Sequence, residues 1–123
     1  MPAILMIDDD TEFSGLVSRH FTGLGYKVAL ASDGAEGLKM AVGLRPDIIF
    51  LDIAMPGMNG IEVLRELHSG DETSDIPVLI ISGKYFDKGM SDLFTQEANC
   101  REFIAKPVAL AILQQKVETH LKK

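Results

Sequence analysis

The chain has 123 residues and a hydrophobic fraction of 46%, a size and composition that suit one ordinary globular domain. Its formal net charge is −6, and no block of basic residues occurs, which argues against direct binding to nucleic acid. The single cysteine excludes an intramolecular disulfide and a zinc site built from cysteines. No signal peptide and no apolar run of membrane length is present, so we expect a cytoplasmic protein that does not engage membranes.

Five short apolar runs alternate with segments of helical period, which is typical of a parallel sheet covered by helices on both faces. The strands are expected at residues 3–7, 26–31, 48–51, 78–81 and 102–105. The third and fourth runs show no polar alternation, so both faces of these two strands should be buried. The pattern therefore predicts one α/β domain over residues 1–123.

Five helices are expected, and capping signals mark the first three. In chain order these signals are Asp10 and Gly25 for the first helix, Asp33 with Glu36 and then Gly43 with Pro46 for the second, and Asn59 with Glu62 and then Gly70 for the third.

Apolar stripes predict the fourth and fifth helices. The fourth stripe is formed by Met90, Leu93, Phe94 and Glu97, with Asn99 as a left-handed cap, and the fifth is formed by Ile112, Leu113, Val117, His120 and Leu121.

Polar residues stand where four of the expected strands end. Three consecutive aspartates, Asp8, Asp9 and Asp10, follow the first strand, Asp52 follows the third, Ser82 the fourth, and Lys106 the fifth. Because parallel strands end at one edge of a sheet, these side chains should gather there. Clustered carboxylates repel one another unless a cation joins them, and Mg²⁺ suits a site with one or two carboxylates and retained waters.

Each of these residues also has a simpler interpretation when it is taken alone. The aspartates can form a solvated turn, Lys106 can extend along the surface, and Ser82 can cap the next helix. Together they provide a carboxylate nucleophile, a cation and a hydroxyl donor at one edge. Carboxylates form aspartyl phosphates, and phosphoryl transfer needs mainly positioning and charge neutralisation, which these groups supply.

The chain resembles response-regulator receiver domains over essentially its whole length. The residues that carry the resemblance are 4–10, 46–52, 55–60, 80–83 and 103–107, in this order and spacing. The resemblance implies a flavodoxin-like sheet with strand order 2-1-3-4-5.

The resemblance also implies roles for individual residues. Asp52 corresponds to the phosphoacceptor and, with Asp9, to a direct Mg²⁺ ligand. Asp8 would act on the metal through water, and the backbone carbonyl of Ala54 would be a further ligand. Lys106 matches the lysine that pairs with the phosphoryl group, while Ser82 and Phe103 match the pair of side chains that switches on phosphorylation.

The same resemblance implies a signalling switch rather than an enzyme, since such domains catalyse only their own phosphorylation and dephosphorylation. The expected donor is a sensor histidine kinase or a histidine phosphotransfer protein. The expected downstream partner is a protein that binds the face formed by the fourth helix, the fifth strand and the fifth helix.

Two other functions are compatible with parts of the sequence. An aspartate-nucleophile phosphatase would carry a second acid two positions after the nucleophile, and Ala54 stands there. A plain nucleotide binder would need a glycine-rich loop after the first strand, where the chain instead has three aspartates. Both alternatives fit the sequence less well than a phosphoacceptor switch.

Overall fold

The computed structural model describes residues 2–53, 60–82, 96–97, 99–106 and 108–121. One parallel sheet with the strand order β2-β1-β3-β4-β5 runs through these residues, which confirms the predicted flavodoxin-like fold. The elements are β1 (Ala3–Ile7), α1 (Thr11–Gly23), β2 (Lys27–Ala31), α2 (Gly34–Leu44), β3 (Ile48–Leu51), α3 (Gly60–Ser69), β4 (Val78–Ser82), β5 (Cys100–Ala105) and α5 (Leu110–Leu121).

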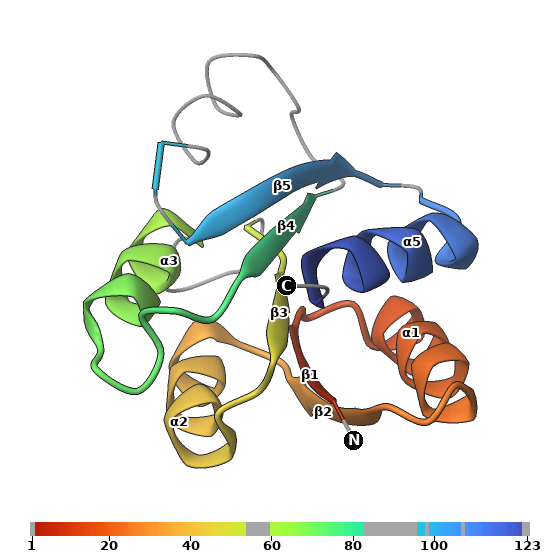
Figure 1. Cartoon of the computed structure of the whole chain (residues 1–123), viewed down its shortest axis with the longest axis horizontal. Coiled ribbons are helices and arrows are strands. Elements are labelled where there is room, and N and C mark those ends of the chain that lie inside the picture. Colours follow the sequence, from red (N-terminus) through yellow and green to blue (C-terminus); the bar gives the residue numbers. More distant parts are fainter. Residues whose placement is uncertain (1, 54–59, 83–95, 98, 107, 122–123) are drawn as a thin grey trace.

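The sheet is the middle of three layers, with α1 and α5 on one face and α2 and α3 on the other (Figure 1). Successive side chains of a strand point to opposite faces, so Ile4 and Met6 of β1 pack towards α1 and α5, whereas Leu5 and Ile7 pack towards α2 and α3. Every residue of β3 and β4 is buried, as the unbroken apolar runs predicted.

Two capping aspartates are confirmed. Asp10 Oδ1 accepts a hydrogen bond from the Phe13 amide at 3.1 Å and begins α1, while Asp33 Oδ1 accepts from the Glu36 amide at 2.8 Å and begins α2. The Glu36 carboxylate reaches back to the amide of Ser32 at 2.9 Å, one residue before the cap. Each helix therefore begins directly after a strand end.

The end of α1 agrees with the sequence, because Gly25 has a φ of 98° and follows the cap residue. The end of α2 agrees with the prediction at Pro46 and differs from it at Gly43. Gly43 stays within the helix, and Arg45 is the left-handed cap, with a φ of 46°. The physical reason is Pro46, which disfavours the right-handed helical conformation for the residue before it.

The stripe expected on the fifth helix is correct at Leu113 and Val117, which are buried, and wrong at Ile112, which is 44% exposed. Of the expected fourth helix, Met90, Leu93 and Phe94 lie outside the described residues, as does the Asn59 cap, while Glu97 lies in a bend. Asn99 is buried, and its side-chain amide donates to the Leu64 carbonyl at 3.1 Å.

Within the described ranges, no helix combines the length and apolar character needed to cross a membrane.

Candidate functional site

The carboxyl ends of β1 and β3 lie next to each other, and each is followed by a buried aspartate. Ile7 pairs with Leu51 in the strand register, and the amide of Asp52 donates to the Ile7 carbonyl at 2.9 Å. On the other side, the amide of Asp8 donates to the Ala31 carbonyl at 3.0 Å. The backbone ladder therefore holds both aspartates at the edge where the sequence placed them.

Asp8, Asp9 and Asp52 form a cluster that we call the acid triad. Each offers one carboxylate oxygen, and these oxygens all lie within 4.8 Å of one another. Asp8 and Asp52 are buried, whereas Asp9 is exposed. Ligands on opposite sides of a Mg²⁺ ion are about 4.2 Å apart, so the triad has a spacing at which two carboxylates can bind directly and a third through water. The donor set of hard oxygen atoms also suits this ion.

Lys106 lies against the acid triad. Its backbone amide donates to the Ser82 carbonyl at 2.8 Å, which fixes the start of its side chain beside β4. Its Nζ atom donates to Asp8 Oδ2 at 2.9 Å and lies 3.9 Å from Asp52 Oδ2. The sequence predicted that this lysine lies beside the aspartates at this edge of the sheet, and in the structure its short ion pair is with Asp8.

Two further residues at the site were missed as site residues. Asp10 caps α1 with one carboxylate oxygen, and its other oxygen lies 3.9 Å from the Nζ atom of Lys106. The ring of Phe13 has its centroid 4.6 Å from the same Nζ atom, a distance at which a cation is attracted to an aromatic face. Phe13 belongs to the apolar stripe of α1, and the sequence carries no signal that distinguishes this contact from core packing.

The proposed switch residues lie on β4 and β5, the two strands that follow β3 in the order of the sheet. Ser82 is the last residue of β4 and is 1% exposed. Phe103 of β5 pairs with Ile80 and is half-buried against the cluster that packs on α2 and α3. Ala54, expected to supply a carbonyl ligand, and Pro107 lie outside the described residues.

Glu102 connects β5 to α5. Its carboxylate contacts the Nζ atom of Lys116 at 3.3 Å and the Nε2 atom of His120 at 3.0 Å. Partial burial acts to raise the pKa of Glu102, but the hydrogen bonds from His120 and Lys116 outweigh it, and the pKa lies below its ordinary value. These charged groups therefore link β5 to α5, two of the elements of the expected output surface.

The comparisons with known proteins agree with this geometry. The family model of the response regulator receiver domain matches residues 4–118. The chain is 39% identical over 118 residues to the DNA-binding dual master transcriptional regulator RpaA of Synechocystis sp., covering 89% of this chain and 49% of that protein. It is 36% identical to the transcriptional regulatory protein PrrA of Mycobacterium tuberculosis, covering 99% of this chain and 51% of that protein.

The chain therefore spans about half the length of these curated relatives. Among solved structures, the chemotaxis protein CheY4 of Vibrio cholerae superposes with a TM-score of 0.89 at 24% identity, covering 97% of this chain and 98% of that one. The structural likeness supports the fold. The family model, which matches nearly the whole chain, supports membership of the family. The chain belongs to the response regulator receiver domains of two-component signalling.

Proposed function

We propose that this receiver domain accepts a phosphoryl group on Asp52, with Mg²⁺ bound at the acid triad. The observation that carries the proposal is the position of Asp52, a buried carboxylate at the end of β3 that lies within 4.8 Å of the carboxylates of Asp8 and Asp9 and 3.9 Å from the Nζ atom of Lys106. The donor is a phosphohistidine on a sensor histidine kinase or a histidine phosphotransfer protein.

The transfer step follows from this arrangement. A carboxylate oxygen of Asp52 forms a bond to phosphorus as the bond between phosphorus and the imidazole nitrogen of the donor breaks. Lys106 is close enough to turn from Asp8 to a phosphoryl oxygen, since its Nζ atom is already within 3.9 Å of Asp52 Oδ2. The hydroxyl of Ser82 would donate a second hydrogen bond to a phosphoryl oxygen. Mg²⁺, when bound, neutralises charge on the transferring oxygens.

The metal ligands are ranked by their surroundings. Asp9 is exposed and contributes to the acid triad, so it would bind the ion directly with Asp52, whereas one oxygen of Asp8 is occupied by Lys106. Asp10 uses its Oδ1 atom to cap α1 and should matter little. Mg²⁺ titrations of the Asp9→Ala, Asp8→Ala and Asp10→Ala variants should show losses of affinity in that order. Equal losses for Asp9→Ala and Asp10→Ala would contradict the ranking.

The phosphorylated domain would act as a switch on a partner protein and would turn over no separate substrate. Phe103 is half-buried on β5, so an inward movement of its ring, together with movement of the Ser82 hydroxyl, would reshape the surface of β5 and α5. The partner would bind there and along the segment before β5. The named relatives are transcriptional regulators about twice as long as this chain, so control of transcription through a further domain is a consistent output.

The decisive test is incubation with acetyl phosphate and Mg²⁺, followed by intact-mass measurement. The wild-type chain should gain one phosphoryl mass, and Asp52→Asn should gain none. Asp71→Asn is the matched control, because Asp71 is an exposed aspartate in the turn after α3, away from the acid triad. A phosphoryl adduct on Asp52→Asn, or none on the wild type, would refute the assignment.

A further inference from the structure

A small recess lies beside the acid triad, between the carboxyl ends of β1 and β2. It has a volume of about 130 Å³, and the residues that line it are Asp8, Thr11, Ser14, Leu30, Ala31, Ser32 and Glu36. A cavity of this volume has room for a small ligand or several waters. Three hydroxyls and two carboxylate-bearing residues line it, so its chemistry is dominated by oxygen atoms.

Ser14 indicates that the recess is built for an occupant. The residue is 4% exposed and faces the sheet from α1, and its Oγ atom has no hydrogen-bond partner within the described part of the chain. A buried hydroxyl without a partner is destabilising, so such groups are normally satisfied by a ligand or an ordered water. Because Ser14 lines the recess, an occupant there can supply the missing partner.

Glu36 fixes the sign of charge that the recess accepts. Its Oε1 atom is held by the amide of Ser32 at 2.9 Å, which orients the carboxylate at the start of α2. Among the described residues, no hydrogen bond reaches its Oε2 atom. Asp8 also lines the recess, but its carboxylate is paired with Lys106. The charge that acts on an occupant is therefore mainly that of Glu36, which repels an anion and favours a cation.

We propose that this recess binds one monovalent cation, the chemistry shared by Na⁺, K⁺ and a primary ammonium group. Magnesium holds its waters tightly and needs nearly ideal octahedral geometry, whereas weakly hydrated cations accept hydroxyl oxygens in irregular arrangements. Ser14, Thr11 and Ser32 provide such oxygens, and Glu36 provides the charge. The site is separate from the acid triad, although Asp8 borders both, and it does not depend on phosphorylation.

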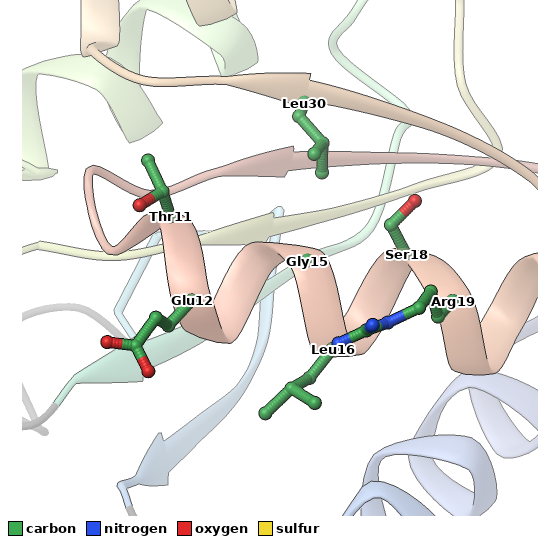
Figure 2. Close-up of a pocket in the computed structure, with 7 residues that line it drawn as sticks. All are labelled: Thr11, Glu12, Gly15, Leu16, Ser18, Arg19 and Leu30. Carbon is green, nitrogen blue, oxygen red and sulfur yellow. The ribbon is translucent and has the colours of Figure 1, made fainter.

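A wider groove runs along α1 beside the recess. The groove has a volume of about 550 Å³ and shares Thr11 and Leu30 with the recess. Figure 2 shows Thr11 and Ser18 on the side of α1 towards Leu30, while Glu12 and Leu16 project from the opposite side of the helix. The shared residues show that the two hollows are neighbours beside α1.

Thermal unfolding of the full chain in magnesium-free buffer tests the proposal. The ionic strength is held constant while tetramethylammonium, which has no N–H donor and whose methyl groups keep its charge away from oxygen ligands, is exchanged for Na⁺, K⁺ or methylammonium. We expect the unfolding midpoint to rise by about 3 °C at saturation with the cation that binds. Comparing the metal ions with methylammonium separates an inorganic from an organic occupant. No rise with any of the three would mean that the recess holds water only, and the proposal would be wrong.

Variants locate the effect. Ser14→Ala removes the unpartnered hydroxyl, and Glu36→Gln removes the charge but retains an oxygen for the Ser32 amide. Both should lose more than half of the cation-dependent rise. Glu12→Gln removes an exposed carboxylate of the neighbouring groove and should retain the rise. An equal rise in all variants would indicate a general salt effect and overturn the proposal.

Asp9→Asn distinguishes the recess from the acid triad, because Asp9 belongs to the triad and does not line the recess. A rise that disappears in Asp9→Asn and survives in Glu36→Gln would place the cation at the triad and refute the recess. As a direct measure, the ²³Na resonance should broaden with the wild-type chain and sharpen on addition of K⁺. The broadening should be lost in Ser14→Ala, and broadening that persists unchanged there would contradict the site.

Discussion

The ion pair between Lys106 and Asp8 should stabilise the metal-free fold far more than a surface pair does. The Asp8 side chain is fully buried and that of Lys106 is 16% exposed, with 2.9 Å between Nζ and Oδ2. Removing one partner of a buried pair leaves an uncompensated charge and costs about 3 kcal/mol. We expect Lys106→Met, which keeps most of the apolar stem, to lower the free energy of unfolding by about this amount.

A double-mutant cycle separates the pair from its surroundings. If Asp8 is the main partner, most of the loss in Lys106→Met should disappear when Asp8→Asn is already present, with a coupling of about 2 kcal/mol. Asp52→Asn should couple less strongly, because its carboxylate is 3.9 Å from the Nζ atom. The matched control is Lys116→Met, whose pair with Glu102 is more exposed and should be worth about 0.5 kcal/mol.

The assay is urea unfolding followed by circular dichroism, in buffer without divalent cations. The slope of the free energy against urea must stay the same among variants for the values to be compared. Two results would refute the reasoning: a loss in Lys106→Met no larger than in Lys116→Met, or a coupling to Asp52 that exceeds the coupling to Asp8. Either would show that the lysine is not held mainly by Asp8 in the metal-free protein.

Three further outcomes are expected. Gly37→Ala should destabilise the fold by about 1–2 kcal/mol in the same urea assay, because the added Cβ atom would overlap the buried Ile7 side chain. Gly43→Ala is the control, since its Cβ atom meets open space and the change should be neutral or stabilising. A larger loss of stability for Gly43→Ala than for Gly37→Ala would contradict this packing. Burial raises the pKa of the Cys100 thiol to about 11, so iodoacetamide at pH 8 should alkylate the folded chain about a hundredfold more slowly than the urea-unfolded chain, and equal rates would contradict the burial. The pKa of Glu102 lies below its ordinary value of 4.5, so its pairs stabilise the fold above that pH and are lost as the pH falls through the lower folded value. The stability difference between wild type and Glu102→Gln, about 0.5 kcal/mol at pH 7, should therefore decrease as the pH is lowered through the acid range, and a constant difference would count against the pairing.

The strands and the edge of the sheet that carries the site were predictable from the sequence, because both follow from patterns that the backbone must obey. Unbroken apolar runs gave β3 and β4, and the shared direction of parallel strands placed Asp8 and Asp52 at one edge. The sheet order itself came from the resemblance to receiver domains, since alternation of strands and helices fits several orders. The caps at Asp10 and Asp33 were predictable because they depend on residues only three positions apart.

Errors arose where a local signal competed with another constraint. Gly43 is a favourable residue for ending a helix, but Pro46 sets the end of α2 two residues later, at Arg45. Ile112 fits an apolar stripe, yet Leu113 and Val117 are one helical turn apart and point to the sheet, which turns Ile112 towards solvent. In both cases a neighbouring residue decided the outcome.

The partner of Lys106 lies beyond what sequence can predict, for a physical reason that also bears on function. Backbone pairing fixes Asp8 and Asp52 to neighbouring strands, but the lysine has a four-carbon stem and three carboxylates within 3.9 Å of its Nζ atom. Small differences in distance and burial therefore decide which carboxylate it binds. The same balance makes the lysine a movable charge: a new anion on Asp52 would add oxygens beside Nζ without requiring any strand to shift, so the rigid sheet holds the acids while the lysine supplies the adjustable contact.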